Sequence, residues 1–97
     1  MIKYLEKDNF NELIKDDLVL VDFYADWCGP CKMLGSVLET MEDLNILKIN
    51  TDTFPELAQK FGVMSIPTVY IFKDGKEVSK FIGFKSKQEI TNLLNDL

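Results

Sequence analysis

Two stretches of the chain are apolar on both alternating faces, which is the pattern of strands buried between layers of helices. Leu18 to Ala25 is one of them, and a single charged residue, Asp22, interrupts it. Leu44 to Asn50 is the other, and its one charged residue is Lys48. We therefore predict two central parallel strands, each of which carries one ionisable side chain among apolar neighbours.

The carboxyl-terminal half of the chain predicts a hairpin. Residues 68–73 and 76–82 have strand-like composition, and Asp74-Gly75 between them is a typical two-residue turn. Charged residues on the second strand suit the edge of a sheet, where they oppose pairing with other chains. Ile2 to Leu5 predicts a further short strand at the amino end.

Four helices are expected among these strands, three of them from apolar residues spaced three and four apart. The first follows Asp8, a candidate N-cap, and the second runs from Cys31 to about Met41. The third begins at Pro55 and ends before Gly62, and the fourth follows a capping box at residues 86–89. The order β-α-β-α-β-α-β-β-α predicts an α/β fold with a mixed sheet sandwiched between helices.

Length and charge restrict the class of protein. The 97 residues are enough for one core and too few for two, so we expect a single domain over residues 1–97. Eleven basic and sixteen acidic residues give a net charge of -5, which argues against nucleic acid as a partner. No apolar run approaches the roughly 20 residues of a membrane span, and Met1 to Asp8 lacks the apolar core of a signal peptide. We expect a monomer in the cytoplasm, a thiol-reducing compartment, without membrane partners.

The only two cysteines, Cys28 and Cys31, lie where the second helix is expected to begin. Residues three apart share one face of a helix, with side chains roughly 5–6 Å apart, so the pair can form a disulfide. Cys28, just before or at the first turn, is the candidate nucleophile, because unpaired N–H groups and the helix dipole favour a thiolate there. We expect Cys28 to be exposed. Cys31, expected one turn inside the helix and more shielded, is the candidate resolving thiol. Gly29 permits a tight entry, and Pro30 suits the first helical position and stiffens the loop.

Three other interpretations of the cysteine pair remain open at this stage. A zinc half-site needs two further ligands, but the chain has no histidine and no third cysteine. A purely structural disulfide closes so short a loop that the entropy model gives only about 2 kcal/mol. Two inert buried thiols have no need of Gly-Pro between them.

Asp22 is the most informative polar residue after the cysteines. Leu20 and Tyr24 lie on the same face of its strand, so its carboxyl group is expected to point into an apolar layer. Burial raises the pKa of a carboxylic acid, which would make Asp22 a proton shuttle. The alternative for Asp22 is a solvated strand end, and for Lys48 an exposed lysine whose stem covers core residues.

Five segments together resemble the thioredoxin family and span most of the chain: Val21 to Met33, Lys48 to Asn50, Ser65 to Thr68, Phe72 to Gly75, and Gly83. Trp-Cys-Gly-Pro-Cys-Lys with a downstream Ile-Pro-Thr is highly specific for this family. The resemblance implies a five-stranded sheet flanked by four helices and the reduction of protein disulfides. It also implies recycling by a thioredoxin reductase, usually a flavoprotein that uses NADPH, with no cofactor bound to the chain itself.

The resemblance also assigns roles to residues around the cysteines. It places Asp22 beneath the dithiol, where it takes the proton of Cys31, and it pairs Lys48 with Asp22. It makes Trp27 a partly exposed lid beside Cys28, although a lone tryptophan more often belongs to a core.

Four further residues are implied to form the substrate surface. The Ile66–Pro67 bond is expected to be cis, with Pro67 against the cysteines and the backbone of Ile66 open to an extended substrate. Ile82 and Gly83 would complete a shallow apolar rim. Their alternatives are a core isoleucine and a simple turn glycine.

Two positions depart from the family pattern. Many relatives have a kinking proline at Ser36, so we predict a milder bend here, with the Ser36 N–H bonded to the Lys32 carbonyl. Thr51 stands where relatives often carry an apolar residue on the substrate rim, which predicts a more polar rim.

Two other functions compete with disulfide reduction. One is a glutathione-linked activity of the glutaredoxin kind, against which Gly-Pro between the cysteines argues. The other is a binding module, a subunit or chaperone of a larger assembly, a role that usually lets the cysteines decay.

Overall fold

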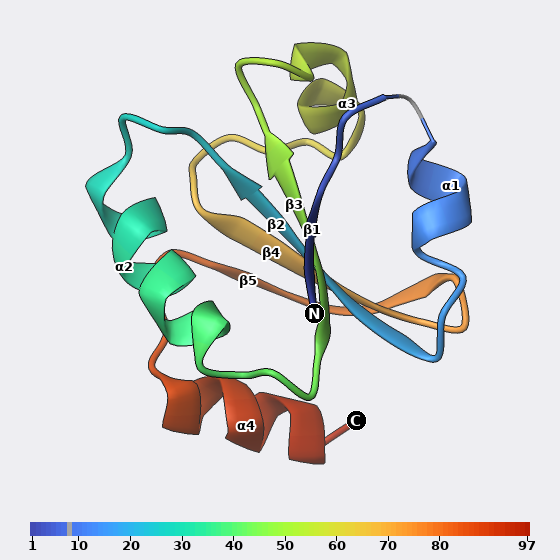
Figure 1. The fold of residues 1–97 in the computed structure, drawn as a ribbon, viewed down its shortest axis with the longest axis vertical. Coiled ribbons are helices and arrows are strands. Elements are labelled where there is room, and N and C mark those ends of the chain that lie inside the picture. Colours follow the sequence, from blue (N-terminus) through green and yellow to red (C-terminus); the bar gives the residue numbers. More distant parts are fainter. Residues whose placement is uncertain (8) are drawn as a thin grey trace.

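Residues 1–7 and 9–97, which the computed structural model describes, form a five-stranded sheet flanked by four helices (Figure 1). The strands are β1 (Ile2–Tyr4), β2 (Leu18–Tyr24), β3 (Asn45–Asn50), β4 (Thr68–Lys73) and β5 (Lys76–Ile82). The helices are α1 (Phe10–Leu13), α2 (Gly29–Glu39), α3 (Pro55–Lys60) and α4 (Lys87–Asn95). The predicted α/β class and order of elements are confirmed.

The sheet has the strand order β1-β3-β2-β4-β5. β3 is parallel to both β1 and β2, whereas β4 is antiparallel to β2 and β5 is antiparallel to β4. β2 and β3 therefore lie inside the sheet, as their apolar patterns predict, and their carboxyl ends lie at the same edge. The loops that follow these two strands leave from that edge (Figure 1).

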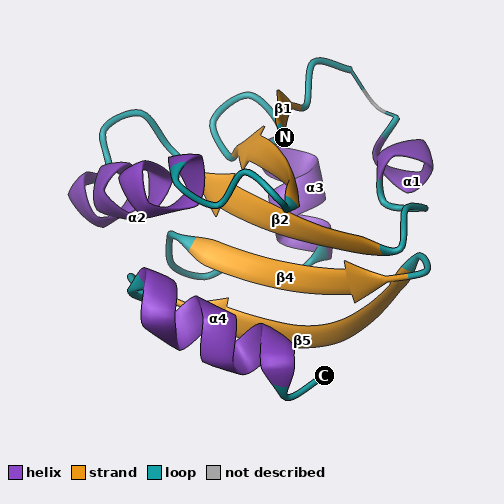
Figure 2. Ribbon diagram, turned by 60° about the horizontal axis from the view of Figure 1, so that its bottom comes forward, coloured by secondary structure: helices purple, strands orange, loops and turns teal. Residues whose placement is uncertain are grey.

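Alternate residues of β2 supply two separate cores, one on each face of the sheet. Val21 and Phe23 pack on the face that α1 and α3 cover. Leu20 packs on the opposite face with Leu34 of α2 and Ile90 of α4. Figure 2 shows α2 and α4 on the near side of the sheet and α3 behind it. Side chains of a strand alternate between its two faces, so Asp22 lies on the same face as Leu20, beneath α2.

Local turn and capping residues place the carboxyl-terminal elements where they were predicted. Gly62, with φ 67°, follows the end of α3, and Asp74 and Gly75 adopt the positive φ angles of the hairpin turn (53° and 81°). Ser86 and Glu89 form the reciprocal capping box that begins α4. β4 and β5 therefore have the predicted boundaries, and α4 begins where the sequence predicts.

Two helices differ from their predicted limits. α1 is a single turn that follows Asn9, and Asp8, expected as its N-cap, lies outside the described residues. α2 begins at Gly29 rather than Cys31, because Cys28 itself is the N-cap, and it ends at Glu39 rather than Met41. The start of α2 thus depends on a cysteine side chain, which sequence rules for capping do not include.

The middle of α2 contains no interruption at the Gly35-Ser36 pair. The Ser36 hydroxyl donates to the Lys32 carbonyl oxygen, at 3.3 Å. α2 is therefore continuous at this position, and the mild bend and the Ser36 N–H bond stay predictions. Among the described helices, none is both long enough and apolar enough to span a membrane.

Candidate active site

Cys28 and Cys31 are joined by a disulfide at the junction between β2 and α2. Their Cα atoms are 5.2 Å apart, within the range that a disulfide bridges without backbone movement. The pair lies at the carboxyl-terminal edge of the parallel strands, beyond the end of β2. The predicted pairing of the two thiols is confirmed.

The N-terminus of α2 directs one backbone N–H at the sulfur of Cys28. The Cys31 N–H donates to Cys28 Sγ at 3.2 Å, and the Cys28 N–H donates to the Ala25 carbonyl oxygen at 3.2 Å. Gly29 is the first helical residue, so Pro30 occupies the second helical position and not the predicted first one. Cys31 is the third and lies within the first turn, not one turn inside. Positive partial charge at a helix N-terminus stabilises a negative sulfur, so this geometry favours the thiolate of reduced Cys28.

Both cysteines are buried in the disulfide form. Cys28 is 5% exposed and Cys31 2%, so the expected order holds, but the expectation of an exposed Cys28 is wrong. Cys28 Sγ lies 3.7 Å from the Ile66 carbonyl oxygen, and Ile66 packs against Ala25 and the two cysteines. A disulfide sulfur carries no hydrogen, so this approach is a contact here and becomes a possible hydrogen bond only in the thiol.

The segment before β4 provides the wall next to this contact. The Ile66–Pro67 bond is cis, as the resemblance implies, and Pro67 is buried. The Gly83 N–H donates to the Pro67 carbonyl oxygen at 2.8 Å, and Gly83 has φ 87°, which suits glycine. Ile82 is 59% exposed, so its alternative as a core residue is wrong. Gly83 is a turn glycine that also ties the end of β5 to Pro67.

Trp27 is a surface residue, 70% exposed, and not part of the core. Its indole Nε1–H donates to Asp52 Oδ2 at 3.0 Å, and the Asp52 N–H donates to Asn50 Oδ1 at 2.8 Å. The loop after β3 therefore anchors the tryptophan that precedes Cys28. Sequence reasoning missed Asp52, because nothing local links it to a residue 25 positions earlier.

The contact between Trp27 and Asp52 gives a prediction for the variant Asp52→Ala. Loss of the acceptor frees the indole, so we expect lower fluorescence anisotropy of Trp27, the only tryptophan, with stability changed by less than about 1 kcal/mol. Time-resolved fluorescence of the purified protein measures the change, and Asp43→Ala is the control at another exposed carboxylate. Unchanged anisotropy in Asp52→Ala would show that the bond does not hold the ring.

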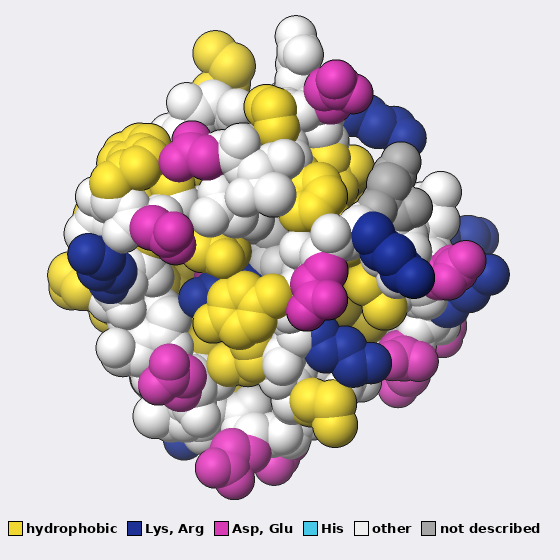
Figure 3. All heavy atoms as spheres, turned by 45° about the horizontal axis from the view of Figure 1, so that its top comes forward, with side chains coloured by type: hydrophobic (Ala, Val, Ile, Leu, Met, Phe, Trp, Pro, Cys, Tyr) yellow, Lys and Arg dark blue, Asp and Glu magenta, His cyan; other side chains and the backbone are white. Residues whose placement is uncertain are grey.

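An open depression borders Trp27. Figure 3 shows one face of the molecule, on which hydrophobic side chains are exposed among charged and polar ones. Thr51 and Ile66 line the depression. Met64, which sequence reasoning did not select, also lines it and is 95% exposed. The sequence offered one indication that Met64 lies at this surface, namely its position two residues before Ile66.

Asp22 is completely buried, so its alternative as a solvated strand end is wrong. Neither carboxylate oxygen has a hydrogen-bond partner among the described residues. The Lys48 ammonium is the nearest opposite charge, at 4.0 Å from Oδ2, and its side chain is 11% exposed rather than free in solvent. Burial raises the pKa of Asp22 to about 6, and the positive charge of Lys48 opposes that rise. Asp22 therefore titrates near neutral pH.

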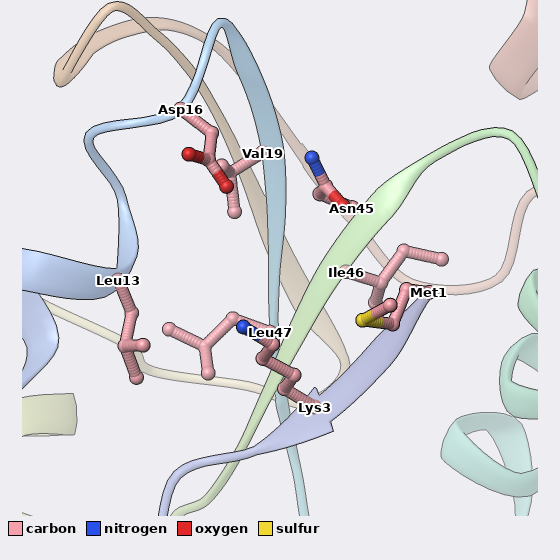
Figure 4. Close-up of a pocket in the computed structure, with 8 residues that line it drawn as sticks. All are labelled: Met1, Lys3, Leu13, Asp16, Val19, Asn45, Ile46 and Leu47. Carbon is pink, nitrogen blue, oxygen red and sulfur yellow. The ribbon is translucent and has the colours of Figure 1, made fainter.

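A second pocket lies away from the dithiol and carries no thiol (Figure 4). Its lining includes Val19 and Asn45, at the starts of β2 and β3, whereas the cysteines follow the end of β2. Within residues 1–7 and 9–97 there is no cluster of three or more side chains suited to bind a metal ion.

Comparison with known proteins gives a consistent result. A family model described as Thioredoxin matches residues 1–96. A thioredoxin of Chlamydia caviae is 48% identical, over 98% of this chain and 97% of the relative. A thioredoxin of Staphylococcus haemolyticus is 47% identical, over 90% and 88%. The structure of a mutant thioredoxin from Halobacterium salinarum NRC-1 superposes with a TM-score of 0.89 at 35% identity, covering 98% of this chain and 88% of that one.

Proposed function

The chain belongs to the thioredoxin family, and from this premise we propose that Cys28 is the attacking thiol and Cys31 the resolving thiol in the reduction of protein disulfides. The family and the cysteine pair make the chain a protein-disulfide oxidoreductase that uses its own dithiol as the redox group. The observation that carries the assignment of roles is the position of Cys28 as the N-cap of α2, with Sγ facing the Cys31 N–H.

The reaction proceeds by two exchanges of sulfur partners. The Cys28 thiolate attacks one sulfur of a substrate disulfide, which forms a mixed disulfide and releases the first substrate thiolate. Cys31 then loses its proton and attacks Cys28 Sγ. The mixed disulfide breaks, the Cys28–Cys31 disulfide forms, and the second substrate thiolate leaves. Two electrons pass from the dithiol to the substrate, and the product is the oxidised state that the structure describes.

Asp22 is the base that receives the proton of Cys31 in this scheme. Its side chain is buried on the α2 side of the sheet, and its raised pKa of about 6 lets it both accept and release a proton close to neutral pH. Lys48 favours the carboxylate form because its ammonium lies 4.0 Å from Oδ2. Without that charge, burial alone would hold more of Asp22 protonated and unable to act as a base.

The substrate binds along the exposed apolar residues around the disulfide. Trp27 and Ile82 are exposed, and Ile66 presents its backbone beside Cys28. An extended substrate segment pairs with the backbone of Ile66. The hydrogen bond between the Gly83 N–H and the Pro67 carbonyl oxygen fixes the protein's own backbone next to Ile66. Gly29 and Pro30 form the exposed turn between the two cysteines.

A thioredoxin reductase that uses NADPH regenerates the dithiol, and the protein acts as a monomer in the cytoplasm. Reduction of insulin disulfides tests this scheme, with either NADPH plus thioredoxin reductase or glutathione as the electron donor. We expect turnover with the reductase and little with glutathione. Turnover with glutathione alone would favour a glutaredoxin-like activity, and no turnover with either donor would favour a binding module.

Pro30 gives a further prediction. Because proline stiffens the turn between the cysteines, Pro30→Ala should change the balance between dithiol and disulfide without unfolding the domain. Equilibration with a glutathione redox buffer measures the reduction potential, and thermal unfolding measures the fold. The matched control is Pro55→Ala, a proline at the start of α3 and outside the active-site turn. A potential in Pro30→Ala equal to that of the unmodified protein would show that the ring does not set this balance.

A further inference from the structure

Two tyrosine rings flank the ammonium of Lys48. Nζ lies 4.6 Å from the centroid of the Tyr24 ring and 5.7 Å from that of the Tyr4 ring. The rings stand edge to face, with centroids 6.2 Å apart and an interplanar angle of 76°. These distances are those of cation–π attraction, in which the negative face of an aromatic ring binds a positive charge.

Strand pairing brings these groups together from three neighbouring strands. Tyr4 of β1 is the direct partner of Lys48 in β3, and Lys48 is the direct partner of Asp22 in β2. Tyr24 is two residues beyond Asp22 on the same face of β2. The row Tyr4, Lys48, Asp22 therefore crosses the sheet beneath α2.

Gly35 of α2 leaves room on another side of the ammonium. A Cβ atom at Gly35 would lie 3.3 Å from Lys48 Nζ, closer than ordinary van der Waals contact. The absence of a side chain there lets the ammonium occupy its place between α2 and the sheet. A lysine side chain is long and flexible, but the Lys48 ammonium is closely surrounded here.

We propose that Tyr4 and Tyr24 are positioning residues that hold the Lys48 ammonium against Asp22. Asp22 has no hydrogen-bond partner among the described residues, and 4.0 Å exceeds hydrogen-bonding distance, so the carboxylate alone does not fix the lysine. The rings supply that restraint. This inference rests on the proposed role of Asp22 as the proton acceptor and adds the residues that keep it competent.

Two other charged side chains line the surface depression beside this row. Asp26 and Lys32 line the same surface depression as the two tyrosines, together with Cys31. Burial raises the pKa of the Tyr24 hydroxyl, so the ring is neutral at physiological pH. β3 lies between β1 and β2 in the sheet, so Lys48 of β3 separates Tyr4 from Asp22. A substitution at Tyr4 should therefore change the pKa of Asp22 through the position of the Lys48 ammonium.

The test is the variant Tyr4→Leu, with Tyr4→Phe as its matched control. Tyr4 is 55% exposed, so neither change opens the core. Loss of the ring lets the ammonium move away, and we expect the pKa of Asp22 to rise by about half a unit in Tyr4→Leu and to stay unchanged in Tyr4→Phe. Carboxyl-resolved NMR titration of the oxidised protein measures it directly.

The same pair of variants in a Lys48→Met background separates positioning from solvent access. Without the ammonium, Tyr4→Leu should no longer raise the pKa of Asp22. An equal rise with and without Lys48, or no rise in Tyr4→Leu at all, overturns the inference. The pH dependence of insulin reduction distinguishes the two proposals: if the pKa rises and the rate profile does not follow it, the tyrosines position Lys48 but Asp22 is not the base.

Discussion

Cys28→Ser should lose all disulfide reduction, whereas Cys31→Ser should keep the first attack and stop at the mixed disulfide. The difference follows from geometry, since Cys28 Sγ is the N-cap of α2 and receives the Cys31 N–H, while Cys31 is the less exposed of the two. A serine hydroxyl is not ionised at neutral pH and is a poor nucleophile toward sulfur. Insulin reduction and mass spectrometry of the protein–substrate adduct measure the two outcomes.

The two single variants are matched controls for each other, because each removes one sulfur and the same disulfide. Equal adduct formation by both would contradict the assignment of an attacking and a resolving thiol. The double variant Cys28→Ser, Cys31→Ser addresses the competing function. If it kept full cellular function, the domain would serve chiefly as a binding module, and its redox chemistry would be incidental.

Asp22→Asn is the second change with a large expected effect: it should raise the stability of the fold and lower the rate of disulfide reduction. The folded protein holds Asp22 at a pKa of about 6, against 3.8 for an ordinary aspartate side chain in water. Between these pH values the folded state binds more protons than the unfolded state, so stability falls as pH rises and the loss is complete above the folded pKa. A difference of about two pKa units corresponds to about 3 kcal/mol.

Asparagine carries no charge at any pH, so Asp22→Asn should be more stable than the unmodified protein by up to about 3 kcal/mol near pH 7. The gain should disappear below about pH 4, where the buried carboxyl group is already protonated. Urea denaturation across this range measures it. Asp26→Asn, at an exposed neighbouring position, is the control and should change stability by no more than about 0.5 kcal/mol.

The same Asp22→Asn protein should reduce insulin more slowly, because Cys31 loses its proton acceptor. The combination of higher stability and lower turnover separates this effect from damage to the fold, which would lower both. Equal rates for the two proteins from about pH 6 to pH 9 would show that Asp22 takes no part in proton transfer.

Sequence patterns predict those parts of this fold that depend on neighbouring residues. Asp74-Gly75 fixes the hairpin and the Ser86–Glu89 box begins α4, because both devices act within four residues of chain. The buried strand β2 follows from its composition alone, and so does the burial of Asp22 within it.

Contacts between distant segments could not be predicted in the same way. Ile66, 38 residues later in the chain, packs against Cys28 and helps to bury it. The residues next to Cys28 do not reveal this contact, so the sequence alone suggested an exposed thiol. The Trp27–Asp52 bond and the tyrosines around Lys48 likewise depend on strand order. The start of α2 was misplaced because its cap is a sulfur atom rather than one of the usual oxygen acceptors.

The unequal reactivity of the two thiols is the central claim, and competitive alkylation of the fully reduced protein tests it most directly. Less than one equivalent of iodoacetamide is added near pH 7, and peptide mass spectrometry then gives the share of label on each cysteine. The N-cap position of Cys28 predicts that the label falls almost entirely on Cys28. Equal labelling, or a preference for Cys31, would contradict the account.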